Sequence, residues 1–203
     1  MLIDIHSENP NPRHIKQMVG ILEQGGIIIY PTDTVYGIGC DIFQPKAVER
    51  ICRLRKLDPK KARLSFICSD MKQIAEYAHQ IDNEVFRLMK HNLPGAFTFV
   101  LRSNNKVPKL FKNKKRTIGV RIPDHAIVQA LVEELGRPIL TASLKSDDEI
   151  LEYFTDAYDI HEDFGNLVDA VIDGGIGENV PSTVVDCTVF PPEILREGAG
   201  ELI

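Results

Sequence analysis

The spacing of hydrophobic positions changes repeatedly between unbroken runs and helical stripes, which predicts strands that alternate with helices. Residues 26–29 form an apolar run typical of a buried strand. Asn11 and Pro12 stand before a helical stripe that ends at Gly25. We expect further strands at 2–5, 64–68, 96–102, 117–121, 138–142, 167–172, 182–187 and 193–197, and further helices from Pro45, from Ser69 or Asp70, from Asp82 and from Pro123. The alternation favours one α/β domain over residues 1–203, with a more β-rich C-terminal end.

One polar segment, YPTDTVYGIGCD at residues 30–41, directly follows the first buried run. Pro31 has no N–H to donate, so the strand should end there. The hydroxyls and the carboxylate of the segment can bind a small polar ligand, and its glycines allow close approach of the backbone. The alternative is an ordinary connection between a strand and a helix.

Composition limits the kinds of protein that this chain can be. It has 203 residues and contains no apolar stretch of about 18 residues, so we expect no membrane span. The first residues lack the basic segment, followed by a long apolar segment, that is typical of a secretory signal. The cysteines are far apart and form no CxxC pair: Cys40, Cys52, Cys68 and Cys187. These features predict reduced thiols and a cytoplasmic location.

Charge is distributed unevenly along the chain, although the net charge is −5. Residues 50–63 carry seven Lys or Arg against one acid, and residues 102–121 carry eight with no acid. From residue 146 onward there are 15 acids and one base, Arg196. Two basic segments in an acidic protein suggest a local anion site rather than a general polyanion binder, although each can also be a solvated face.

Several common catalytic patterns are missing from the sequence. There is no P-loop, and the glycines at 37–39 and 174–177 match only part of a dinucleotide fingerprint. The histidines form no HxxxH pair of the kind that would indicate a metal site. Ser143 lacks the context of a nucleophile elbow. We therefore expect no catalytic nucleophile and no metal held by the protein alone.

Four small polar or basic residues lie at the ends of predicted strands, where ligands bind in open α/β sheets. Arg121 can clamp a carboxylate, or it can tie the loop at Asp124. Ser143 and Ser182 can contact a ligand, or they can cap a helix and satisfy the backbone. Arg196 can form a salt bridge or reach a phosphate.

The chain resembles the threonylcarbamoyl-AMP synthase family, the YrdC/YciO-type domain, over nearly its whole length. The resemblance is carried by six strings in family order: YPTDTVYGIGCD at 30–41, LPGAFTFVL at 93–101, TIGVRIPD at 117–124, the segment around Ser143, PSTVVD at 181–186 and LREG at 195–198. The amino-acid sequence of residues 86–143 is most similar to that of the YciO branch.

The resemblance implies a twisted mixed sheet with flanking helices and a concave basic face. It implies that L-threonine, bicarbonate and ATP condense to threonylcarbamoyl-AMP and pyrophosphate, with Mg²⁺ accompanying ATP, and that the product is used for the t6A modification of tRNA. Thr34, Arg121 and Ser182 would then bind threonine. The nucleotide would be bound by Arg53, Arg55, Lys60, Lys61, Ser143 and Arg196.

Two departures from the family pattern lie on the nucleotide side. Leu57 stands where the basic cluster has an arginine, with Lys60 and Lys61 close by, and Lys145 stands in place of an asparagine that contacts the adenylate. A lysine cannot both donate and accept as an amide does. Two alternatives therefore stay open: a non-catalytic protein of the YciO type that binds double-stranded RNA, tRNA or the ribosome, and an enzyme that makes or hydrolyses another carbamoyl adenylate.

Overall fold

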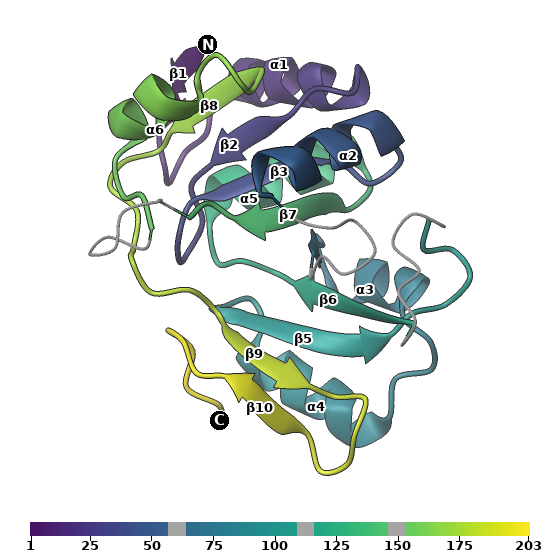
Figure 1. The fold of residues 1–203 in the computed structure, drawn as a ribbon. Coiled ribbons are helices and arrows are strands. Elements are labelled where there is room, and N and C mark those ends of the chain that lie inside the picture. The colour runs from purple at the N-terminus through teal and green to yellow at the C-terminus, as the bar shows by residue number, and fades with distance from the viewer. Residues whose placement is uncertain (57–63, 109–115, 146–152) are drawn as a thin grey trace.

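A computed structural model describes residues 1–56, 64–108, 116–145 and 153–203. Within these residues, strands form one mixed sheet in the order β1-β8-β2-β3-β7-β4-β6-β5-β9-β10 (Figure 1). The strands are β1 Leu2–Asp4, β2 Ile28–Tyr30, β3 Gly37–Asp41, β4 Ser65–Ile67, β5 Phe97–Arg102, β6 Thr117–Arg121, β7 Ile139–Ser143, β8 Ala170–Asp173, β9 Thr183–Asp186 and β10 Glu193–Arg196. The helices are α1 Pro12–Glu23, α2 Pro45–Leu54, α3 Met71–Tyr77, α4 Asn83–Asn92, α5 Ala126–Leu135 and α6 Ala157–Phe164.

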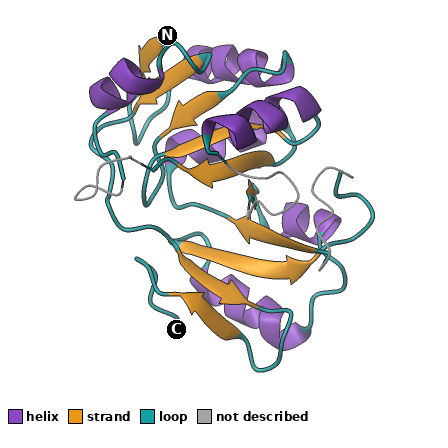
Figure 2. Ribbon diagram, viewed as in Figure 1, coloured by secondary structure: helices purple, strands orange, loops and turns teal. Residues whose placement is uncertain are grey.

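Helices cover both faces of the sheet, and each face has its own hydrophobic cluster (Figure 2). Ile28 and Tyr30 belong to the cluster that contains α1 and α5, whereas Ile27 and Ile29 belong to the one that contains α2. Successive side chains of a strand point to opposite faces, so a strand covered on both sides is apolar throughout. This explains the unbroken apolar run in the sequence, and the single-domain α/β architecture is confirmed.

The helix starts follow the polar residues that the sequence indicated. The side chain of Asn11 accepts a hydrogen bond from the backbone N–H of Arg13 at 2.9 Å, with Pro12 as the first helical residue. The carboxylates of Asp70 and Asp82 cap α3 and α4 by accepting from backbone N–H groups at 2.7 and 2.9 Å. These caps satisfy donors that would otherwise have no partner at the helix ends.

Two of the differences from the expected boundaries lie next to the candidate site. The segment after Pro31 is not only a connection, because Gly37–Asp41 forms β3 and pairs with both β2 and β7. The fifth helix does not open at Pro123 and Asp124 but begins at Ala126, with His125 at the N-cap. The backbone N–H of Asp124 donates instead to the carboxylate of Asp33 at 3.1 Å, which holds this residue outside the helix.

Glycines in β3 make room for the side chain of Tyr30. The ring of Tyr30 crosses β3, and its hydroxyl donates to the Thr141 hydroxyl of β7 at 2.9 Å. A Cβ at Gly37 would lie 3.2 Å from this ring, and one at Gly39 would lie 2.7 Å from the Tyr30 oxygen. On the side where a Cβ would stand, these two positions are therefore filled by close packing inside the sheet.

The four cysteines provide a first testable prediction. None is in a disulfide in the described part of the chain; Cys40, Cys52 and Cys68 are buried, and Cys187 is half-buried. Burial raises the pKa of Cys187 to about 12 and raises those of Cys40 and Cys68 well above the usual value. Since the thiolate is the reactive form, we expect all four to react slowly with Ellman's reagent at pH 8 and rapidly in guanidinium chloride. Rapid reaction of two or more thiols in the native protein would contradict this arrangement.

Candidate functional site

The loop between β2 and β3 is held in shape by its own hydroxyl groups. Thr32 Oγ1 accepts from the backbone N–H of Thr34 at 3.1 Å and donates to the carbonyl of Val35 at 2.8 Å. Threonine side chains favour such local turns because they replace hydrogen bonds of the backbone. From outside the loop, the N–H of Glu178 donates to the carbonyl of Thr34 at 3.2 Å. The backbone of Thr34 is thus held on both sides.

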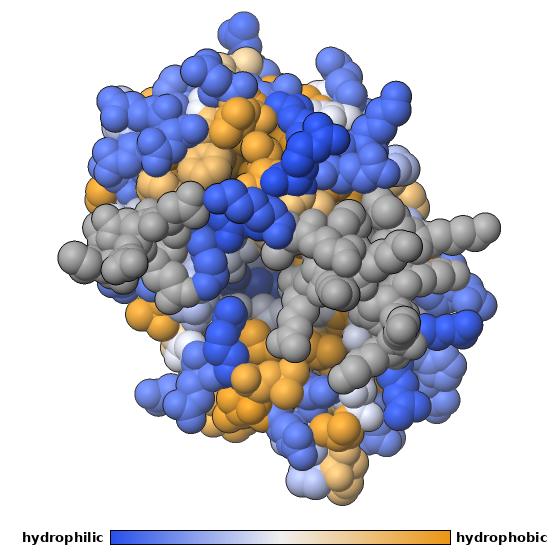
Figure 3. Space-filling model, viewed as in Figure 1, coloured by the Kyte–Doolittle hydropathy of each residue, from blue (hydrophilic) through white to orange (hydrophobic). Residues whose placement is uncertain are grey.

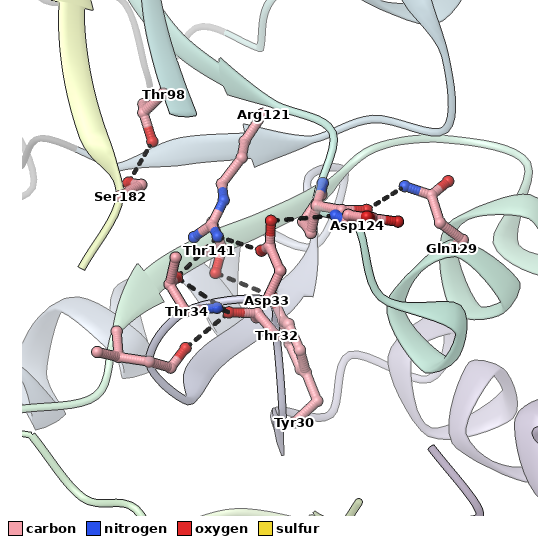
Figure 4. Close-up of polar contacts among 12 residues, drawn as sticks. Tyr30, Thr32, Asp33, Thr34, Thr98, Arg121, Asp124, Gln129, Thr141 and Ser182 are labelled. Atoms are coloured by element: carbon pink, nitrogen blue, oxygen red, sulfur yellow. Dashed lines mark hydrogen bonds and ion pairs between the residues drawn. The ribbon is translucent and has the colours of Figure 1, made fainter. Parts of the chain in front are cut away.

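Arg121 joins this loop to the far half of the sheet. It lies at the end of β6 and points toward Asp33 and Thr34 (Figure 4). Its Nη2 donates to Thr34 Oγ1 at 2.7 Å and forms an ion pair with Asp33. The second carboxylate oxygen of Asp33 accepts the N–H of Asp124. Arg121 therefore contacts Asp33 rather than the Asp124 loop directly, and Asp33 connects the two.

Ser182 lies on the other side of Arg121, across neighbouring strands. Phe99 of β5 pairs with Val120, so Thr98 is the next β5 residue beside Arg121. The hydroxyls of Thr98 and Ser182 are 2.8 Å apart (Figure 4). Arg196 donates through Nη2 and Nε to the Ser182 carbonyl at 2.7 and 3.2 Å. The strand order β6-β5-β9 thus places the Thr98–Ser182 pair near the strand that carries Arg121, and Arg196 of β10 supports Ser182.

The group formed by Arg121, Asp33 and Thr34 is nearly closed to solvent. Thr34 is fully buried, and the side chains of Arg121 and Asp33 are 8% and 11% exposed. Two nitrogens with no partner among the described atoms lie here: Arg121 Nε and His125 Nδ1. Burial lowers the pKa of His125, against the opposing effect of Asp33 and Asp124. The imidazole is therefore neutral near pH 7, and Arg121 is the cation that faces the loop.

Three of the residues predicted to bind the nucleotide lie at or near the ends of α2 and β7. Arg53 is exposed near the end of α2, and Arg55 at its C-cap donates to the carbonyl of Lys145 at 3.1 Å. Ser143 ends β7 opposite Gly37 of β3. These contacts bring Arg55 close to the end of the Ser143 segment. Lys60, Lys61 and Leu57 lie outside the described residues, as do most lysines of the second basic segment.

Figure 3 shows hydrophilic side chains in the hollow at the middle of one face, with hydrophobic ones gathered below it. A separate recess of about 560 Å³ lies between the α3–α4 connection and the β9–β10 turn. Its walls include His79, Asp82, Arg102 and Phe190, and none of the predicted site residues lines it. Among the described residues there is no group of three or more His, Cys, Asp or Glu that could hold a metal ion.

Sequence reasoning did not single out several members of the site. Asp33 and Arg121 are 88 positions apart, and Thr98 and Ser182 are 84 apart. His125 carries no local motif. A usable signal was available for Asp33, since it stands within the polar loop beside Thr34. The remaining partners depend on strand register, which only the fold provides.

Across the described helices, none is long and apolar enough to span a membrane.

Known proteins resemble the chain over most of its length. The family model of Sua5, YciO and YrdC proteins, described as "Telomere recombination", matches residues 20–198. The uncharacterized protein YciO of Escherichia coli K12 is 42% identical over 98% of this chain and 95% of its own length. Its crystal structure superposes with a TM-score of 0.93, at 40% identity, and covers 99% of this chain and 97% of that one.

A second relative has a named activity. The threonylcarbamoyl-AMP synthase of Pyrococcus abyssi is 34% identical over 91% of this chain and 54% of its own length. The crystal structure of P. abyssi Sua5 complexed with L-threonine gives a TM-score of 0.88, at 32% identity, over 98% of this chain and 57% of that one. The chain belongs to the Sua5, YciO and YrdC family, which includes threonylcarbamoyl-AMP synthase.

Proposed function

We propose that the protein condenses L-threonine, bicarbonate and ATP to threonylcarbamoyl-AMP and pyrophosphate, as a step toward modified tRNA. The observation that carries this proposal is the buried group in which Arg121 contacts Thr34 and Asp33 while Thr98 contacts Ser182. A buried guanidinium beside a threonine hydroxyl suits a small carboxylate ligand that also carries a hydroxyl. The threonine-bound structure of P. abyssi Sua5 supports the choice of amino acid.

The reaction requires positioning more than a nucleophile from the protein. The threonine amine and bicarbonate form a carbamate with loss of water. A carbamate oxygen then attacks the α-phosphorus of ATP, and pyrophosphate leaves. Both partners of the second step are anions, so cations lower the barrier by offsetting their repulsion. Arg121 would hold the threonine end, Arg53 and Arg55 would face the phosphates, and fixed geometry would supply much of the rate.

Magnesium enters this proposal as part of the substrate. Mg²⁺ prefers phosphate oxygens and water and dehydrates reluctantly, so it usually arrives with the nucleotide. Ser143 and Lys145 lie beside the Arg55 contact and would meet the nucleotide from the end of β7. Lys145 can neutralise a phosphate, although it cannot replace both hydrogen bonds of an amide.

The direct test is a product assay. Purified protein with ATP, Mg²⁺, bicarbonate and threonine should release pyrophosphate and form threonylcarbamoyl-AMP, detected by mass spectrometry. Omitting threonine or bicarbonate should abolish product. An amount no greater than in a control without protein would refute the synthase. Salt-dependent RNA binding without turnover would point to a binding protein instead.

Two variants should separate the two sides of the site. Thr34→Ala removes the hydroxyl that accepts from Arg121, so we expect the KM for threonine to rise about 10-fold and the KM for ATP to stay unchanged. Arg55→Ala should do the reverse, because a cation near the phosphates is lost. Steady-state kinetics with each substrate varied in turn measures both effects. Thr34→Ser, which keeps the hydroxyl, should behave like the wild type.

A further inference from the structure

Asp33 is a charged residue of the site that the proposed reaction does not yet use. Its side chain is 11% exposed and forms an ion pair with Arg121. One oxygen is paired with Arg121 and the other accepts the N–H of Asp124. An ionised carboxylate offers about four acceptor positions, so each oxygen keeps capacity for another donor.

Contacts with Arg121 and with the Asp124 N–H hold the Asp33 carboxylate in place. Swinging the carboxylate away would leave Arg121 with an unpaired buried charge and would remove the partner of the Asp124 N–H. Its backbone is also held, because the neighbouring Thr34 bonds to Thr32 through its N–H and to Glu178 through its carbonyl. A ligand of Arg121 must therefore bind next to Asp33 rather than in its place.

The charges next to this position disfavour a plain anion. Asp33 is negative, Arg121 is positive, and His125 is neutral because burial lowers its pKa, whereas the Asp124 carboxylate is exposed to solvent. A lone carboxylate would be attracted by Arg121 and repelled by Asp33 at similar range. A zwitterion meets both, since its carboxylate can face the guanidinium while its ammonium donates to Asp33.

We propose that Asp33 recognises the α-ammonium group of the amino-acid ligand, so that the Arg121–Asp33 pair selects an α-amino acid over a hydroxy acid or other carboxylate. This inference rests on the proposed function, because it assumes that an amino acid binds at Arg121. It assigns Asp33 a role in specificity, because Asp33 would distinguish ligands that carry an amino group from ligands that do not.

Isothermal titration calorimetry with two ligands tests the inference: L-threonine, and 2,3-dihydroxybutyrate, in which a hydroxyl replaces the amino group. Wild type should bind threonine about 10- to 100-fold more tightly than the hydroxy acid, as expected for a hydrogen bond between charged groups. Asp33→Asn should weaken threonine binding by most of that factor and leave the hydroxy acid unchanged or tighter. Asp124→Asn, which removes an exposed carboxylate from the neighbouring loop, should keep the wild-type preference.

Other outcomes overturn the inference in distinguishable ways. Equal weakening of both ligands in Asp33→Asn would mean that Asp33 only supports Arg121. Equal strengthening of both would mean that it competes with the ligand carboxylate. Failure of wild type to bind threonine at all would instead remove the proposed function. If Asp33→Asn does not fold, equal affinity of the wild type for the two ligands would still refute the amine contact.

Discussion

Replacing Arg121 with methionine is expected to destabilise the protein by about 3–5 kcal/mol and to abolish measurable threonine binding. The substitution leaves Asp33 as an uncompensated charge at a site where its side chain is 11% exposed. It also removes the donor to Thr34 and the cation proposed to bind the ligand carboxylate. Chemical denaturation measures the first effect, and calorimetry with threonine measures the second.

Arg137 provides a matched control for this prediction. It donates through Nε and Nη2 to one oxygen of the buried Asp41, at 2.9 and 2.7 Å, away from the Thr34 loop. Arg137→Met should therefore lower the free energy of unfolding in the same direction while leaving the affinity for threonine unchanged. Similar losses of threonine binding in both variants would mean that stability, rather than a contact at Arg121, governs binding.

A second variant separates charge pairing from ligand recognition. In the double variant Arg121→Met with Asp33→Asn, no buried charge is left alone, so most of the lost stability should return. Threonine binding should not return. Arg121→Lys keeps the charge but loses the planar guanidinium, so it should fold better than the methionine variant and bind threonine more weakly than wild type.

Local chemistry made much of the fold predictable from the sequence. Asn11, Asp70 and Asp82 marked helix starts because a cap is a short-range interaction between a side chain and the following backbone. The strand at 117–121 was predicted with its observed bounds, since its polar and apolar residues match a half-covered strand between turn signals.

The features that were missed depend on contacts between distant residues. Gly37–Asp41 has little intrinsic preference for a strand, because glycines lack side chains to pack. It becomes β3 because Tyr30 covers the two glycines and reaches Thr141. The start of α5 moved because Asp124 is bound by Asp33, a residue 91 positions earlier. No window of local sequence contains such information.

The candidate site followed the same division. Thr34, Arg121 and Ser182 were predicted; the structure brings Arg121 and Thr34 into contact and places Ser182 against Thr98 on a neighbouring strand. Arg196 was predicted on the nucleotide side, and its described contacts are with Ser182. Its role toward ATP stays a prediction, as do those of Arg53, Arg55 and Ser143. The sequence places a residue at the end of a strand, but it does not show which neighbouring residue the side chain contacts.

Gly39→Ala should be among the most disruptive single-methyl additions in the chain. The new Cβ would lie 2.6 Å from the carbonyl oxygen of Leu140, 2.7 Å from the Tyr30 hydroxyl and 2.8 Å from Ile139 Cγ2. The first of these atoms belongs to the backbone of the paired strand, so it cannot move without disturbing β7. We expect a loss of about 1–3 kcal/mol in the free energy of unfolding, typical of an overpacked core.

The added methyl group should also disturb the contact between Tyr30 and Thr141. Relief of the clash with the Tyr30 hydroxyl requires the ring to shift, which breaks its hydrogen bond to Thr141. Tyr30→Phe in the same chain would remove the hydroxyl clash but not the Leu140 clash, so rescue should be partial. Gly20→Ala is the control, because its Cβ meets nothing within 4 Å on α1 and should stabilise the helix by about 0.5–1 kcal/mol. Equal stability of the two alanine variants would contradict the role of Gly39, since it would mean that β3 has room for a side chain beneath Tyr30.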